Sequence, residues 1–276
     1  MKLTYLGTAA AEGWPALFCQ CSHCARAKKA GGKNIRTRSQ ALVDNDLLID
    51  FPPDTYMHIL YSDADFCKIK ACLVTHDHSD HLYAEDLLMR GPVFAHLYPE
   101  TCLDVYGTAG VGRKIKKVVD ENMPAGSKRV AFHELVPFMP ATVLDYEVLP
   151  LRANHAADTD PVIYAISKGN KALLYANDTG YFPESTWQSL EKHRPYFQFV
   201  SLDCTCILIE CRDGHMGLTA CGETRDRLLQ MGCADENTVF CIHHFSHNGG
   251  LIHDELVPVA AKMGFMVSYD GMTVEL

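Results

Sequence analysis

Short apolar runs alternate with polar turns along the chain, and several of these runs end at an aspartate or a histidine. Residues 2–6 predict a strand, and residues 41–43 and 47–49 predict a hairpin that ends at Asp50. Residues 71–74 predict a further strand, because four apolar residues directly precede a polar stretch that is rich in histidine. The amino-terminal half therefore supplies strands whose ends carry candidate ligands.

The carboxyl-terminal half repeats this arrangement. The apolar runs and the polar residues that follow them are 148–151 before His155, 171–175 before Asp178, and 237–242 before His244. In α/β folds, ligands gather at the carboxyl ends of the strands. Each of these residues alone has an ordinary structural explanation as a surface histidine or a turn acid. Their recurrence after apolar runs favours one shared site.

Helical periodicity predicts helices over residues 83–89, 112–121 and 215–229. Ser79 is a suitable N-cap for the first helix, and the two residues after it would then lie in the first helical turn. The chain shows no fixed-period repeat, low-complexity tract or interdomain linker. We therefore expect a single α/β domain over residues 1–276.

A His-x-His-x-Asp-His motif, formed by His76, His78, Asp80 and His81, directly follows the strand predicted at 71–74. Alternate side chains of an extended segment share a face, so the first two histidines are expected to project to one side. Imidazole and carboxylate donors suit zinc, manganese and iron better than calcium or magnesium. A solvated histidine-rich loop or a single structural metal is the alternative, but the spacing favours a metal centre.

Composition narrows the class of protein. With 276 residues and 47% hydrophobic content, the chain can bury a substantial core. No apolar run reaches the ~18 residues of a membrane span, and the first residues do not resemble a signal peptide, so a cytoplasmic location is expected. The net charge of -9 argues against a nucleic-acid partner. Residues 26–38 hold six cations without an acid, and a solvated basic loop is favoured over an anion-steering patch.

Three of the twelve cysteines, Cys19, Cys21 and Cys24, lie within six residues. Three thiolates can occupy three corners of a tetrahedral structural zinc site. His23 or a residue elsewhere in the chain would have to supply the fourth ligand. Free buried cysteines are the alternative, although so tight a cluster is awkward to bury in a core.

The histidine motif resembles the signature of the metallo-β-lactamase superfamily, whose hydrolases carry one or two metals in a four-layer αββα sandwich. The resemblance implies this fold, with two catalytic ions that are manganese or zinc, or alternatively iron. The implied ligands are His76, His78 and His155 for one ion, Asp80, His81 and His244 for the other, and Asp178 as a catalytic bridge. Two such ions lower the pKa of a bound water from 15.7 to ~7 and so supply hydroxide. The role of Asp50 stays open, because it could either orient a metal-binding imidazole or be a simple turn residue.

Most of the chain also resembles the PhnP family, the cyclic phosphodiesterases of the bacterial carbon–phosphorus lyase pathway. The cysteine cluster and the His-x-x-His spacing near the carboxyl terminus carry this resemblance. It implies a structural zinc held by Cys19, Cys21, Cys24 and His247. It also implies that His215 protonates the leaving alkoxide, although a helix-capping or surface histidine is the alternative.

These resemblances together predict a phosphodiesterase that acts on a small or cyclic phosphate ester. A thioester or lactone hydrolase, or a non-catalytic carrier protein of a cofactor pathway, is the alternative. A carrier would have a depleted ligand set, whereas all seven positions are filled here. Residues 97–139 align poorly with the phosphodiesterases, so the substrate stays open, and a homodimer is expected from the family likeness alone.

Overall fold

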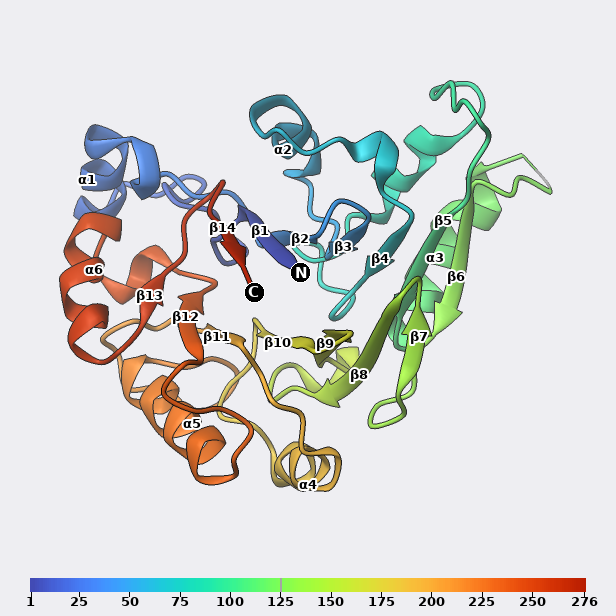
Figure 1. Ribbon diagram of the computed structural model, residues 1–276. Coiled ribbons are helices and arrows are strands. Elements are labelled where there is room, and N and C mark those ends of the chain that lie inside the picture. Colours follow the sequence, from blue (N-terminus) through green and yellow to red (C-terminus); the bar gives the residue numbers. More distant parts are fainter. Residues whose placement is uncertain (125) are drawn as a thin grey trace.

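Two seven-stranded sheets face each other in the computed structural model, which describes residues 1–124 and 126–276 (Figure 1). The first sheet has the order β14 (Thr273–Glu275), β1 (Lys2–Gly7), β2 (Gln40–Val43), β3 (Leu47–Ile49), β4 (Ala71–Leu73), β5 (Leu103–Gly107), β6 (Val130–Glu134). The second has the order β13 (Met266–Val267), β12 (Val239–His243), β11 (Phe199–Asp203), β10 (Lys171–Ala176), β9 (Val162–Lys168), β8 (Tyr146–Arg152), β7 (Ala141–Val143). The two termini lie together, because β1 and β14 pair at one edge.

Each sheet contains a parallel part that is relevant to the site. Strands β3 to β6 are parallel neighbours in the first sheet, and β10 to β13 are parallel neighbours in the second. Parallel strands deliver their carboxyl ends to the same edge of a sheet. Apolar side chains such as Leu47, Tyr164 and Leu173 fill the space between the sheets and exclude water from it.

Helices cover the outer faces of both sheets (Figure 1). Helix α3 (Ala109–Asn122) packs on the first sheet with the 3-10 helix η3 (Ala84–Arg90), and α2 (Thr55–Tyr61) follows β3. The helices α1 (Ser22–Ala30), α4 (Glu184–His193), α5 (Leu218–Gln230) and α6 (His253–Lys262) pack beside the second sheet. Short 3-10 turns are η1 (Gly32–Asn34), η2 (Phe66–Lys68), η4 (Ala157–Thr159) and η5 (His247–Gly249). The predicted αββα sandwich is therefore confirmed.

The segment after the histidine motif is not the α-helix that its sequence predicts. Residues 83–89 lie largely within the 3-10 helix η3, and Ser79 does not cap it. Leu82 is held in a β-bridge with Phe51, whose amide donates to the carbonyl oxygen of His81 at 2.7 Å. This bridge holds the end of the motif in a turn ahead of the helix.

The basic stretch at residues 26–38 is only partly solvated. Arg36 is buried, and its guanidinium donates to Thr8 Oγ1 and to the carbonyl oxygen of Ser268, both at 2.7 Å. Burial lowers the pKa of Arg36 to about 10. The prediction of a solvated loop is therefore wrong for Arg36, because folding brings the carboxyl-terminal segment against it.

Residues 97–139, which align poorly with the phosphodiesterases, contain strands β5 and β6 of the first sheet and helix α3, which covers that sheet. Position 125 lies outside the described residues.

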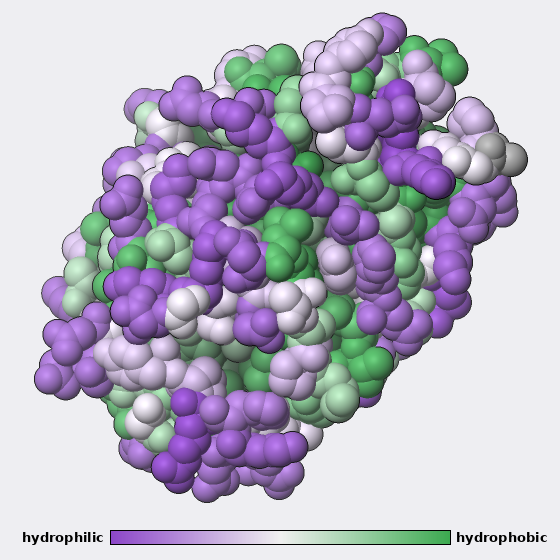
Figure 2. Space-filling view, turned by 45° about the vertical axis from the view of Figure 1, so that its right-hand side comes forward, coloured by the Kyte–Doolittle hydropathy of each residue, from purple (hydrophilic) through white to green (hydrophobic). Residues whose placement is uncertain are grey.

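The face shown in Figure 2 is mainly hydrophilic, with small apolar patches between polar side chains. In the described part of the chain, no helix is long and apolar enough to cross a membrane.

Candidate metal centre

Side chains that follow six strands converge at one end of the sandwich. The strand ends supply Asp50 after β3, His76, His78, Asp80 and His81 after β4, His155 after β8, Asp178 after β10, Asp203 at the end of β11, and His244 after β12. The seven implied ligands form two groups that share Asp178, and within each group the candidate ligand atoms lie within 4.8 Å of one another. The first group contains His76, His78 and His155, and the second contains Asp80, His81 and His244.

Asp178 faces histidines of both groups. Its Oδ2 lies 3.3 Å from His76 Nε2 and 3.1 Å from His81 Nε2. Its Oδ1 lies 3.2 Å from His155 Nδ1, and the residue is almost completely buried. A carboxylate in this position can bridge two cations.

Four histidines of the cluster are each anchored through Nδ1. The acceptors are Thr75 Oγ1 for His76 at 3.1 Å, Asp50 Oδ2 for His81 at 2.7 Å, the carbonyl oxygen of Gly214 for His155 at 3.0 Å, and Thr205 Oγ1 for His244 at 2.8 Å. A hydrogen bond donated by Nδ1 fixes the tautomer in which Nε2 carries a free lone pair. Such outer partners orient imidazoles that bind metals.

The inward nitrogens fit a metal because their hydrogen-bonding capacity is otherwise unused. The buried Nε2 atoms of His76, His81 and His244 have no hydrogen-bond partner within residues 1–124 and 126–276. Buried polar side-chain atoms are nearly always partnered, so three unpartnered nitrogens in one cluster call for a bound cation. The mixed nitrogen and oxygen donors suit zinc, manganese or iron.

Asp50 has the orienting geometry rather than that of a simple turn residue. It is fully buried, its Oδ2 accepts from His81, and its Oδ1 accepts from the amide of Thr75 at 2.8 Å. One carboxylate therefore holds both the start and the end of the histidine motif.

Three residues of the site have backbones in the left-handed region. The φ angles are 64° for Asp50, 49° for Asp178 and 61° for His244. A left-handed backbone costs a residue with a side chain roughly 1–2 kcal/mol. Strain of this kind on three separate strand ends marks the site as one that the surrounding fold holds in place.

Burial and neighbouring charges shift the pKa values of the cluster in different directions, so His76 and Asp178 have the protonation states that metal ligands need, whereas His81 must release a proton when it binds a metal. Burial lowers the pKa of His76 to about 4, and His81 adds to this effect. Burial also opposes a charge on His81, but Asp80 outweighs it and holds the pKa of His81 well above its usual value. For Asp178, burial is likewise outweighed, and His244 holds its pKa well below the usual range. The Asp178 carboxylate is therefore ionised at neutral pH, which is the form that could bind a metal.

His215 lies against the cluster. Its Nδ1 is 3.1 Å from Asp178 Oδ1 and 3.4 Å from Asp203 Oδ2. Burial opposes protonation, but these two acids outweigh it and raise the pKa of His215 to about 11. The predicted helix begins only at Leu218, because the amide of Met216 is held by Asp203 Oδ1 at 2.8 Å.

Asp203 is the site residue to which the sequence analysis assigned no role. It is fully buried at the end of β11, accepts from Thr205 Oγ1 at 2.9 Å, and lies 3.3 Å from His244 Nδ1. An available signal was the apolar run that ends in this acid, because the same arrangement occurs at Asp50.

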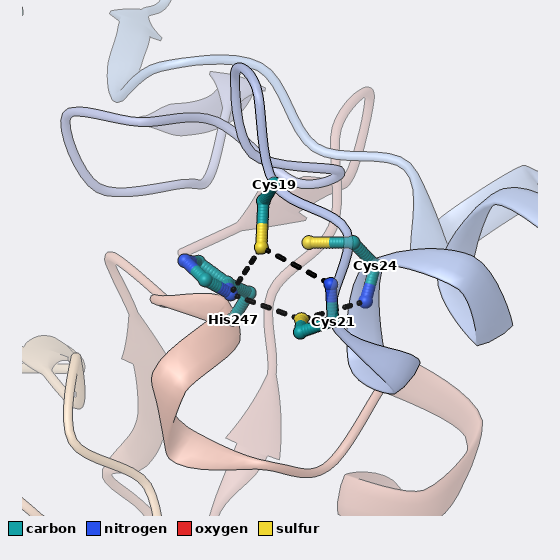
Figure 3. Close-up of side chains that lie close together, drawn as sticks. All are labelled: Cys19, Cys21, Cys24 and His247. Atoms are coloured by element: carbon teal, nitrogen blue, oxygen red, sulfur yellow. Dashed lines mark hydrogen bonds between the residues drawn. The ribbon is translucent and has the colours of Figure 1, made fainter.

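The cysteine cluster is assembled around His247, and Figure 3 shows the four side chains directed toward one point. His247 Nδ1 lies 3.7 Å from Cys19 Sγ and 3.4 Å from Cys21 Sγ. The Cys21 thiol caps α1, and the hydrogen bond from the amide of Cys24 lowers the pKa of Cys21 to about 6. His23 is not in this group, because its Nδ1 bonds to the carbonyl oxygen of His247.

Comparison with known families matches residues 46–244 to the model described as the Beta-lactamase superfamily domain. The chain belongs to the β-lactamase superfamily. The matched span of this superfamily member includes all seven residues of the two groups that share Asp178. The three cysteines of the cysteine cluster precede the matched span. No curated protein sequence matches the chain.

Solved structures share the fold of this superfamily member. Zn²⁺-bound PqqB from Methylobacterium extorquens has a TM-score of 0.78 and 20% identity, with 100% of both chains covered. A diphosphatase from the PhnP family has a TM-score of 0.74 and 20% identity, with 100% of this chain and 97% of that chain covered. The short form of human tRNase Z has a TM-score of 0.67 and 14% identity, with 100% and 99% covered. At these identities the likeness shows the fold alone.

Proposed function

We propose that the protein is a metal-dependent hydrolase whose catalytic centre holds two divalent ions, manganese or zinc, or alternatively iron. The observation that carries this proposal is the pair of ligand groups that share Asp178, with three inward nitrogens that have no partner among the described residues. His76, His78 and His155 would hold one ion, Asp80, His81 and His244 the other, and Asp178 both.

The cysteine cluster would hold one structural zinc. Three thiols and one imidazole complete a tetrahedral donor set, which is the composition of closed structural zinc sites. The pKa of Cys21 is lowered to about 6, whereas burial raises the pKa of Cys24 to about 12, so zinc would displace the Cys24 proton when it binds.

The proposed substrate is a small phosphate diester. The cavity over the metal centre has a volume of about 520 Å³, which suits a small molecule better than a polymer. A PhnP-family diphosphatase with the same fold acts on a phosphate compound, which supports phosphoryl chemistry here. A cytoplasmic location and a homodimer stay predictions from the sequence.

Two bound ions would supply a hydroxide nucleophile at neutral pH and offset the charge that develops on the phosphoryl oxygens. The chain's own residues contribute orientation and a proton. Asp50 and Thr205 hold two of the imidazoles in the required tautomer. His215 directs Nδ1 toward Asp178, which leaves Nε2 for proton transfer to the leaving alkoxide.

The alternatives predict different measurements. A thioester or lactone hydrolase would use the same metal centre on another ester, whereas a carrier protein would bind a ligand without turnover. The likeness to PqqB concerns the fold, and the complete ligand set favours catalysis over carriage.

Metal analysis and a substrate panel test the proposal together. Protein purified without chelator should contain about three metal ions per chain, including one zinc. It should hydrolyse bis(p-nitrophenyl) phosphate faster than thioesters or lactones. One metal per chain, or the reverse substrate order, would contradict the proposal. Replacement of the exposed His193 by alanine is a matched control for histidine removal.

A further inference from the structure

The cavity over the metal centre contains an acid that belongs to neither group of implied ligands. Glu12 lies in the loop between β1 and α1 and lines the cavity together with His215 and Asn248. Its Oε1 accepts a hydrogen bond from Ser246 Oγ at 2.5 Å and lies 3.8 Å from His247 Nε2. Within the described residues both contacts use Oε1, so Oε2 is left for a ligand in the cavity.

Basic side chains near the cavity are engaged elsewhere. Neither lysine nor arginine is among the described residues that line it. Arg38 approaches through a hydrogen bond to the carbonyl oxygen of Ala11, but its guanidinium is paired with Asp54. Lys114 donates to the carbonyl oxygen of Asp77. The protonated His215 is paired with Asp178 and Asp203. A second negative charge on a substrate would therefore find no lysine or arginine among the described residues of the cavity.

We infer that Glu12 determines specificity by selecting phosphate diesters whose non-reacting alcohol carries a positive charge. The inference rests on the proposed phosphodiester hydrolysis and deepens it. One phosphate charge would be met by the metal centre, while the distal part of the ester reaches Glu12. The Glu12 side chain is 29% exposed, so its charge is only partly screened by water.

The chain's overall charge acts in the same direction. A net charge of -9 attracts cations and repels polyanions before any contact forms. The inferred substrate class is thus a zwitterionic diester, with one anionic phosphate and one cationic group.

The test compares three p-nitrophenyl phosphodiesters that differ in the charge of the second alcohol. These are the choline ester, its neutral isostere with carbon in place of the quaternary nitrogen, and a carboxylate-bearing ester of similar length. The wild-type protein should show kcat/KM highest for the choline ester and lowest for the carboxylate ester. Glu12→Gln should reduce the ratio between these two esters on the order of 10-fold.

Glu12→Gln keeps a carbonyl oxygen for the Ser246 hydroxyl, and zinc analysis of the variant checks that the cysteine cluster is intact. Glu236→Gln removes the same charge at an exposed position before β12, so it should leave the ester ratio as in the wild type. An unaltered ratio in Glu12→Gln, or a wild-type protein indifferent to charge, would overturn the inference.

Product binding separates this inference from the proposed function. Calorimetry of phosphocholine and its neutral isostere with the metal-loaded protein measures charge preference without turnover. Preference for phosphocholine with no hydrolysis of any diester would refute the phosphodiesterase while retaining the role of Glu12. Hydrolysis of the neutral ester together with equal binding of both products would refute the role of Glu12 while retaining the phosphodiesterase.

Discussion

The cysteine cluster and the histidine–aspartate centre are built from the chain in different ways. Three of the four cysteine-cluster residues come from one segment of six residues, and only His247 is remote. The other centre takes its side chains from strand ends in both sheets and adjoins a cavity. Closed donor sets are typical of structural zinc, and an open face is typical of catalytic metals. A short local motif can therefore supply most ligands of a structural metal site, whereas the proposed catalytic centre needs residues that only the assembled fold brings together.

The two clusters meet at the end of β12. His244 belongs to the histidine–aspartate centre, and His247 opens the 3-10 turn η5 three residues later. Ser246 lies between them and bonds to Glu12 of the amino-terminal loop. A zinc ion on His247 would thus also hold the segment that presents His244.

Removal of the shared ligand is expected to have the largest effect. Asp178→Asn leaves both groups without their common anion, and we expect activity to fall ~10⁴-fold or more, because the metals supply several kcal/mol of transition-state stabilisation. Metal analysis should show loss of the catalytic ions and retention of one zinc. Asp63→Asn, at an exposed position, is the matched control. Loss of the zinc as well would abolish the distinction between the clusters.

His215→Ala should lower kcat ~10²–10³-fold while all metals stay bound, because His215 is a proton donor rather than a ligand in this proposal. The measurement is steady-state kinetics with metal content determined on the same sample. A loss of kcat smaller than ~10-fold would remove the role of general acid.

Asp50→Asn sharpens the comparison from the outer side of the catalytic centre. The substitution replaces the negatively charged acceptor of His81 Nδ1 with a neutral amide, so the affinity for the metal held by His81 should fall ~10–100-fold. Titration of metal-free protein measures this change. Unaltered metal affinity would show that Asp50 holds the Thr75 backbone without contributing to metal binding.

Cys21→Ser tests the coupling between the clusters. We expect loss of the structural zinc and, through His247 and the segment before it, ~10-fold weaker metal binding at the catalytic centre. Cys67→Ser removes an exposed thiol outside the cluster as a control. Full occupancy of the catalytic centre together with normal turnover would refute the coupling.

A smaller effect concerns acid stability beneath the catalytic centre. His58 donates to Gln40 Oε1 at 2.5 Å, and Gln40 donates to the carbonyl oxygen of Asp50. Burial lowers the pKa of His58 to about 4. The unfolded chain therefore binds this proton more readily, and stability that is complete above pH ~6.5 is lost as the pH falls toward ~4.

For His58→Gln, the difference in unfolding free energy between about pH 7 and pH 5 should shrink by roughly 2 kcal/mol. Denaturant titrations at the two pH values give this difference, with His193→Gln as the exposed control. An equal pH dependence in wild type and variant would contradict the assignment.

The amino-acid sequence by itself determined the fold class and the candidate ligands, because apolar runs that end in histidine or aspartate reflect strands and the residues at their ends. The cysteine spacing likewise indicated a structural metal site with most of its ligands in one short segment. The residues alone left the fourth member of the cysteine cluster open, and the PhnP resemblance implied His247. Only the tertiary structure showed that His247, and not His23, lies beside the three cysteines and that Asp203 lies against His244. It also decided that Asp50 anchors the histidine motif and that Arg36 is buried. These features depend on pairing between segments far apart in the chain, which no local pattern encodes.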